Sequence, residues 1–234
     1  VLSTVGVGVS VAVVATAGHF LLALPWTTAL IIGAILASTD AAAVFSVLRV
    51  VPLPRKITGI LEAESGFNDA PVVLLVVAFV AQASPGATPD PWWWVGVKAV
   101  LKLVGGALIG LGIGWLGGRI LTRVAGSSAL FSIGILALTV LAYAAGATVH
   151  ASGFLATYVA ALVLGNMGLP YYVAVRSFAT AMGWLAQIGL FVLLGLVASP
   201  TDLPQQIVPA IVLGLVLLLV ARPLSVLVSL LPFN

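Results

Sequence analysis

Hydrophobic residues fill the chain in long runs, which short groups of proline, glycine and charged residues separate. Runs of about 20 apolar residues recur along the whole sequence, and such a run crosses roughly 30 Å of hydrocarbon as a helix. Transmembrane strands alternate polar and apolar residues, whereas Ile207 to Ala221 is apolar on every face. The pattern predicts an all-α, polytopic transmembrane bundle with about eight spans: 1–24, 27–48, 57–83, 92–123, 128–147, 152–165, 172–198 and 206–230.

Composition supports a membrane domain and excludes several other classes of protein. The chain is 62% hydrophobic but only 6% charged, whereas an ordinary soluble domain has roughly a quarter of its residues charged. We therefore expect residues 1–234 to form a single transmembrane domain. The absence of cysteine excludes thiol chemistry, and two histidines are too few for a histidine metal site. The nine lysines and arginines are few and scattered, most of them at helix ends, and they form no basic stripe for nucleic acid.

The positions of lysine and arginine predict the orientation in the membrane. Most of them fall in or beside the segments 49–56, 119–127 and 166–176, which lie on one side if the spans alternate. By the positive-inside rule this side is cytoplasmic, and we expect a plasma membrane, here a bacterial inner membrane. Lys98 and Lys102 lie inside the fourth span, where their long side chains can extend to the outer interface.

Acidic residues are concentrated in one part of the chain. Four of the six, Asp40, Glu62, Glu64 and Asp69, fall in the second and third spans. A carboxylate in hydrocarbon costs at least about 2.5 kcal/mol, so it marks an ion or proton path or pairs with a neighbouring helix. For Asp69 we favour the ion path, and for Glu64 the internal pair. Glu62, close to the cytoplasmic end, is a candidate for a cytoplasmic funnel.

Helical geometry divides the third span into two polar stripes. Ser65 and Asp69 lie one turn apart and about 40° from each other, whereas Glu64 and Asn68 lie on a separate stripe. The first stripe offers a carboxylate and a hydroxyl, which are hard oxygen ligands for sodium, potassium or a proton. The second stripe needs a cation from another helix.

Arg222 is the candidate for this cation, because it lies well inside the last span. A Glu64–Arg222 pair would leave Asp69 without a countercharge and able to exchange a proton for a cation. In the second span, Thr39 and Asp40 are the expected site of a helix break, since exposed backbone dipoles at such a break can hold ions. The alternative is an intact helix with Ser38 and Thr39 bonded to their own carbonyls.

These residues resemble the NhaP-type sodium (or potassium)/proton antiporters. Residues 62–69, Glu-Ala-Glu-Ser-Gly-Phe-Asn-Asp, are similar to the Glu-x-Glu-Ser-x-x-Asn-Asp signature of that family. Residues 38–44, Ser-Thr-Asp-Ala-Ala-Ala-Val, one helix earlier, and Arg222 in a later helix also agree. The resemblance covers the whole chain, from about the fourth helix of the family to its eleventh.

The resemblance implies a role for each of the matching residues. Asp69 would bind cation and proton in competition, with Ser65 and Thr39 as oxygen ligands and Asn68 orienting the site. Glu64 and Arg222 would form the interhelical ion pair of the family, and Asp40 would offset the dipoles of an unwound helix. The only metal expected is the monovalent cation, with no cofactor, and the partners are the bilayer and a second copy in a homodimer that works by a rocking motion.

Two departures from the family pattern concern which ion is transported and whether the chain is truncated. Ala41 stands where many members have proline, and this alanine-rich version resembles the potassium/proton branch. The chain starts at Val1 without methionine and stops at a loop-like Leu231 to Asn234, so we expect it to be truncated at both ends.

Other classes of function fit the residues less well. An intramembrane protease would need a serine and a base, but the spacing of His150 and Ser152 does not make them face each other on a helix. We therefore do not expect an enzyme. A cation channel usually repeats one filter loop around an axis, and no such repeat is present. A non-transporting membrane subunit would not need an acid and an ion pair buried together.

Overall fold

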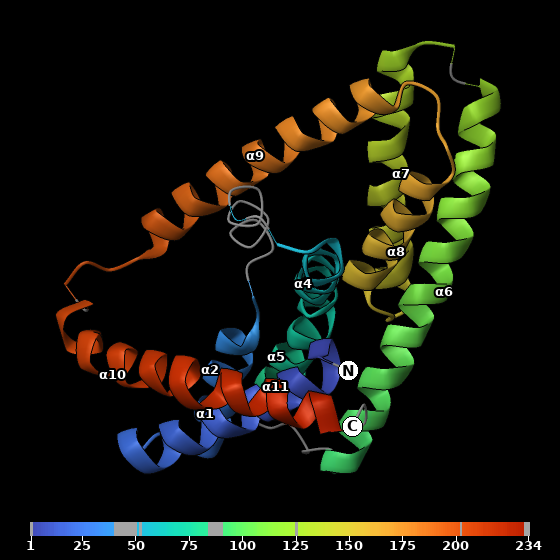
Figure 1. Cartoon of the computed structure of the whole chain (residues 1–234). Coiled ribbons are helices and arrows are strands. Elements are labelled where there is room, and N and C mark those ends of the chain that lie inside the picture. The colour runs from blue at the N-terminus through green and yellow to red at the C-terminus, as the bar shows by residue number, and fades with distance from the viewer. Residues whose placement is uncertain are drawn as a thin grey trace. The chain divides into compact units, whose positions relative to one another are not determined.

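The computed structural model describes residues 2–39, 51, 53–83, 91–124, 126–201 and 203–231, and all regular elements in these ranges are helical. The chain divides into two compact units. The first consists of Val1–Val100 and Gln205–Asn234, and the second of Leu101–Pro204. Figure 1 shows the helices of both units coloured by residue number.

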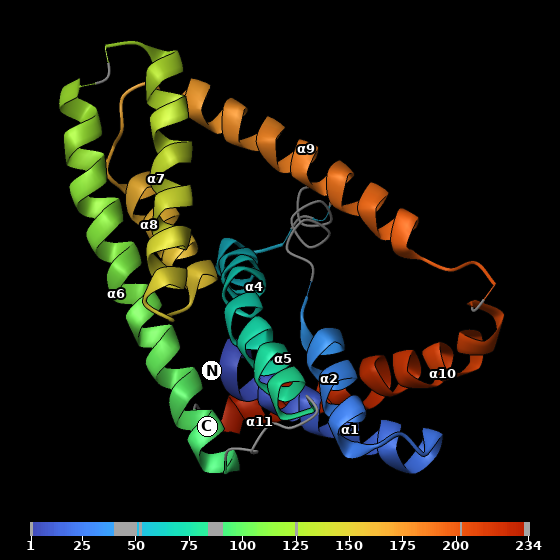
Figure 2. The same cartoon turned by 180° about the vertical axis from the view of Figure 1, so that it is seen from behind.

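The first unit brings the two ends of the chain together. Its elements are a π-helix η1 (Leu2–Gly6), α1 (Val7–Leu22), α2 (Trp26–Ala37), α4 (Arg55–Phe67), α5 (Asp69–Ala83), the start of α6 (Trp92–Val124), most of α10 (Leu203–Val216), a π-helix η2 (Leu217–Ala221) and α11 (Arg222–Leu230). Figures 1 and 2 show α1, α2, α5 and α11 packed side by side. Their core contains the small and β-branched side chains of Val7, Val11, Ala34 and Val72 together with the ring of Phe79.

Three of the apolar segments in this unit are interrupted. The helix α2 ends at Ala37, and Ser38 is extended, with φ −66° and ψ 146°. The third predicted span divides at Asn68, three residues before Pro71, whose ring removes one helical N–H donor and crowds the preceding turn. The last span contains the π-turn η2, in which the Arg222 N–H bonds the carbonyl of Leu217, directly before Pro223.

The second unit contains uninterrupted helices that approach closely through glycine. It consists of α6 from Leu101 onward, α7 (Ser128–Thr148), α8 (Gly153–Asn166) and α9 (Tyr172–Val197). A Cβ on Gly110 would meet the Ala156 backbone and lie 2.9 Å from Val159 Cβ. A Cβ on Gly114 would lie 3.0 Å from the Ala160 carbonyl oxygen. Glycine therefore lets the backbones of α6 and α8 touch.

The all-α prediction is confirmed, and the predicted number of spans is approximate. Among the residues that the structure describes, six helices are long and apolar enough to cross a membrane: Ser3–Leu22, Lys56–Ala83, Trp93–Val124, Ser128–Thr148, Tyr172–Val197 and Leu203–Leu230. Two shorter apolar helices, Trp26–Ala37 and Gly153–Asn166, correspond to the predicted second and sixth spans. Residues 40–50, which include the predicted end of the second span, lie outside the described residues. The cytoplasmic side and the single domain stay predictions.

Candidate cation site

The extended residues after α2 present two hydroxyl groups to two different carboxylates. The Ser38 hydroxyl donates to Asp69 Oδ1 at 2.7 Å, and the Thr39 hydroxyl donates to Glu64 Oε1 at 3.3 Å. Successive side chains of an extended chain point to opposite sides, whereas on a helix they would be only about 100° apart. The end of α2 at Ala37 is therefore what lets neighbouring residues serve two acids.

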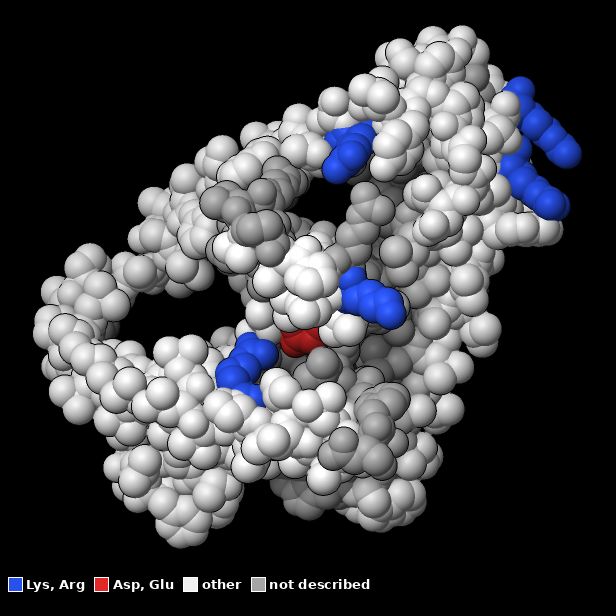
Figure 3. Space-filling model, in the orientation of Figure 1, with Lys and Arg blue, Asp and Glu red and all other residues white. Residues whose placement is uncertain are grey.

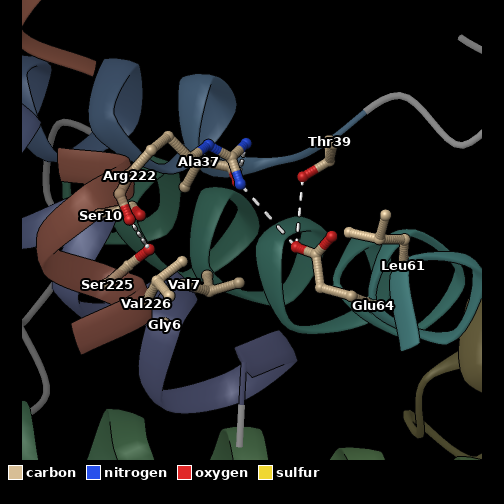
Figure 4. Close-up of a pocket in the computed structure, with 10 residues that line it drawn as sticks. All are labelled: Gly6, Val7, Ser10, Ala37, Thr39, Leu61, Glu64, Arg222, Ser225 and Val226. Carbon is tan, nitrogen blue, oxygen red and sulfur yellow. Dashed lines mark hydrogen bonds and ion pairs between the residues drawn. The ribbon is translucent and has the colours of Figure 1, made fainter. Parts of the chain in front are cut away.

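Glu64 lies among three donor groups. Its Oε1 accepts from Asn68 Nδ2 at 3.2 Å. The same oxygen accepts from the Thr39 hydroxyl and lies 3.8 Å from Nη1 of Arg222 (Figure 4). The Glu64 side chain is 16% exposed and the Arg222 side chain 31%. This carboxylate thus has a countercharge, one hydrogen bond from the residue that ends its own helix and one from the extended segment after α2.

Arg222 also binds the broken end of α2. Its Nη2 donates to the carbonyl of Ala37 at 3.2 Å and to that of Ser38 at 3.3 Å. The last carbonyls of a helix have no partner in the helix and carry a partial negative charge, which a cation stabilises. One guanidinium therefore fixes the carboxylate of Glu64 and the backbone that carries the two hydroxyls.

Asp69 is in a different environment from Glu64. It is half-buried at the first residue of α5, and within the described ranges no lysine or arginine pairs with it. Two buried polar atoms nearby in sequence have no hydrogen-bond partner, the hydroxyl of Ser65 and Oδ1 of Asn68, and both residues are 0% exposed. Buried polar atoms without partners are rare, so their acceptor capacity is available to a ligand.

A cavity of about 300 Å³ opens beside the Glu64–Arg222 pair. Besides these two charged residues, the hydroxyl-bearing side chains of Ser10, Thr39 and Ser225 line it. In Figure 4, Ser10 of α1 and Ser225 of α11 lie next to each other, and Thr39 lies across from them beside Glu64. Figure 3 shows acidic surface as a small red patch with basic side chains on either side. This part of the first unit thus forms a polar pocket in an otherwise apolar helical fold.

The structure places the sequence-predicted residues as follows. The structure brings Glu64 and Arg222 together as an ion pair. The junction of α4 and α5 carries Ser65, Asn68 and Asp69. The Thr39 hydroxyl is bonded to Glu64, so its predicted role as a ligand beside Asp69 stays a prediction. Asp40 and the side chain of Glu62 lie outside the described residues.

Ser38 is the residue that the sequence analysis did not select. The predicted break was at Thr39 and Asp40, whereas the helix already ends at Ala37. The relevant signal was present, because Ser38 is the first of three consecutive polar residues in an apolar segment.

A comparison with protein families identifies the family in which this arrangement of broken helices and buried charges occurs. The family model described as "Sodium/hydrogen exchanger, transmembrane" matches residues 1–234. The chain belongs to this family. It is thus a multi-pass membrane protein of a transporter family.

Several relatives of this exchanger-family chain are named as antiporters of a monovalent cation and protons. It is 35% identical to the K(+)/H(+) antiporter NhaP of Alkalimonas amylolytica, matching 100% of this chain and 41% of that protein. The K(+)/H(+) antiporter NhaP2 of Shewanella oneidensis is 36% identical, again over 100% and 41%. The Na(+)/H(+) antiporter NhaS2 of a Synechocystis strain is 31% identical over 97% and 42%. The chain thus spans about two fifths of the length of these relatives.

A solved structure supports the fold. The sodium proton antiporter MjNhaP1 from Methanocaldococcus jannaschii superposes with a TM-score of 0.86 at 22% identity. The match covers 98% of this chain and 57% of that one. At this level of identity the likeness applies to the fold and not to the residues of the site.

Proposed function

We propose that the protein is a secondary antiporter that exchanges a monovalent cation for protons across the membrane. The observation that carries the proposal is the contrast between two neighbouring acids. Glu64 has an arginine and two hydrogen-bond donors, while Asp69 has a serine hydroxyl and, in the described part of the chain, no basic partner. A membrane-embedded carboxylate without a countercharge needs a proton or a cation to become neutral.

Competition for Asp69 accounts for coupled exchange. The carboxylate holds either the cation or the proton, so one is released before the other is carried back. Ser65 contributes a buried hydroxyl oxygen that is free to face the ion, and Thr39 and Asn68 support the site through their bonds to Glu64. Because Glu64 is neutralised locally, its charge does not compete for the transported ion.

Further parts of the proposal rest on the family relationship. Asp40 compensates the dipole of the broken helix, Glu62 lies in the cytoplasmic approach to the site, and the protein works as a homodimer. Residues 1–234 form one transport domain in this proposal.

The transported ion is potassium or sodium, and the relatives support potassium first. The relatives at 34% to 36% identity are named K(+)/H(+) antiporters, while the Na(+)/H(+) antiporter NhaS2 is 31% identical. All-oxygen ligands suit either ion.

A transport assay in proteoliposomes tests the proposal. Proton movement is followed with a pH-sensitive dye inside the vesicles while K⁺ or Na⁺ is added outside. We expect cation-driven proton flux that Asp69→Asn abolishes, because the amide cannot exchange a proton for a cation. Asp202→Asn, which removes an acid that the sequence assigns to a loop, is the matched control and should retain activity.

Two results would contradict the proposal. Full exchange by Asp69→Asn would remove Asp69 from the site. A cation conductance without obligatory proton movement would indicate a channel.

A further inference from the structure

We propose that the Ser38 hydroxyl is a direct ligand of the transported cation, and that it alternates between the empty carboxylate of Asp69 and the bound ion. This inference rests on the proposed function and adds a ligand from α2 to the site. Its oxygen lies 2.7 Å from Asp69 Oδ1, so one cation can contact both oxygens.

The chemistry of a hydroxyl fits both states of the site. A serine hydroxyl has one O–H donor and two acceptor lone pairs, and it rotates freely about its C–O bond. In the structure the O–H is donated to the carboxylate, which leaves the lone pairs facing away from Asp69. When a cation takes the carboxylate, the O–H turns away and a lone pair faces the ion. The same side chain therefore stabilises the empty carboxylate and coordinates the loaded ion.

The backbone of Ser38 is held independently of this hydroxyl. Arg222 donates to the carbonyls of Ala37 and Ser38, 3.2 and 3.3 Å away. The end of α2 is therefore fixed by a guanidinium and main-chain oxygens, and the Ser38 side chain is left to the ion site. Thr39 differs from it, because its hydroxyl is bonded to the neutralised Glu64.

A second hydroxyl, that of Ser65, is close to the same acid in the sequence and has no hydrogen-bond partner. Ser65 is fully buried, its oxygen has no hydrogen-bond partner, and it precedes Asp69 by one helical turn. Ser38 after the end of α2 bonds the Asp69 carboxylate, and Ser65 on α4 offers a second hydroxyl whose oxygen is unoccupied. A cation bound there joins the extended end of α2 to the junction of α4 and α5.

Variants of equal shape test this role. Valine and threonine at position 38 differ by a methyl in place of a hydroxyl, so Ser38→Thr and Ser38→Val are compared in proteoliposomes, with Ser38→Ala as a third variant. For Ser38→Val and Ser38→Ala we expect the cation KM to rise about tenfold, the usual effect of losing one bond to a charged partner. The maximal rate at saturating cation should stay within about twofold. Ser38→Thr should keep a KM close to that of the unmodified protein.

A binding measurement gives a second readout that does not need transport. Thermal unfolding in detergent is followed while K⁺ or Na⁺ is added, and the cation concentration that produces half of the stabilisation is recorded. Ser38→Val should need about ten times more cation than Ser38→Thr. Ser229→Ala is the control, because Ser229 is a buried serine on α11 with no hydrogen-bond partner for its hydroxyl, and it should not change this concentration.

The outcomes separate this inference from the proposed function. Equal KM values and equal cation titrations for Ser38→Val and Ser38→Thr would overturn the inference. If Asp69→Asn still abolishes exchange in that case, the antiporter proposal stands without a Ser38 ligand. If the unmodified protein shows no cation-coupled proton flux, the proposed function itself fails.

Discussion

The two units of the molecule differ in whether their helices are interrupted. In the first, α2 ends early, α4 and α5 divide at Asn68, and α10 and α11 are joined through a π-turn. In the second, α7, α8 and α9 run without interruption. The first unit carries Glu64, Asp69 and Arg222, whereas the described residues of the second contain no acid. Chemistry is thus located where helices are broken, and close packing where they are intact.

Different residues produce these two behaviours. Pro71 and Pro223 stand beside two of the interruptions in the first unit, because proline removes a helical donor and crowds the turn before it. In the second unit Gly110 and Gly114 leave the helix intact and allow the next helix to touch its backbone. A proline frees backbone groups for an ion or a side chain, whereas a glycine only shortens a distance between helices.

The largest effect in this comparison is expected for Arg222→Gln. The change leaves the Glu64 carboxylate without its cation and removes a charged donor from the carbonyls of Ala37 and Ser38. Because the pair is partly exposed, we expect a loss of about 2–3 kcal/mol in the free energy of unfolding and a loss of exchange. Unfolding in mixed micelles and the proteoliposome assay measure the two effects.

Two further variants provide controls for Arg222. Arg176→Gln removes an exposed arginine at the start of α9 and should cost less than about 0.5 kcal/mol. Glu64→Gln combined with Arg222→Gln should recover part of the lost stability, because no unpaired carboxylate remains. A double variant less stable than Arg222→Gln would mean that Glu64 is not neutralised by this arginine.

A smaller effect is expected for Gly110→Ala in the second unit. The added Cβ would meet the Ala156 backbone, which must move, so we expect a loss of about 1–3 kcal/mol in unfolding free energy. Gly112→Ala is the matched control two residues away, where a Cβ meets nothing within 4 Å. It should be neutral or stabilise the helix by up to about 1 kcal/mol.

Transport kinetics decide whether Gly110 acts through packing alone. Folded Gly110→Ala protein should keep the cation KM of the unmodified protein. An altered KM at unchanged stability would contradict the division between a unit for chemistry and a unit for packing.

The smallest effects are expected at the helix caps of the second unit. The Ser152 hydroxyl accepts from the Leu155 N–H at 3.3 Å and is buried, while Ser127 accepts from the Leu130 N–H at 3.4 Å and is exposed. We expect Ser152→Ala to cost about 1 kcal/mol and Ser127→Ala about 0.5 kcal/mol in unfolding free energy. Equal losses, measured in the same micelles, would show that burial does not strengthen the cap.

The all-α fold could be predicted from the sequence, since long apolar runs and punctuating prolines are local signals. The third span and Arg222 could be singled out because charge is costly in an apolar helix. The pairing of each hydroxyl with its acid could not be predicted. It depends on the residue at which α2 ends, because the extended chain from Ser38 onward sends successive side chains to opposite sides. The π-turn before Arg222 was also missed, because Leu217–Ala221 is uniformly apolar and carries no polar signal.

Arg222 lies 184 residues after the carbonyl of Ser38 that it binds. During synthesis at about 5–20 residues per second, roughly ten to forty seconds pass between the addition of Ser38 at the end of α2 and the addition of Arg222. Once Glu64 has been made, it and the uncapped helix terminus are present in the growing chain without their basic partner until Arg222 is added. The Glu64–Arg222 pair is therefore among the last contacts of these 234 residues to be assembled, and a chain that ends before α11 has most of its apolar helices but an unpaired Glu64.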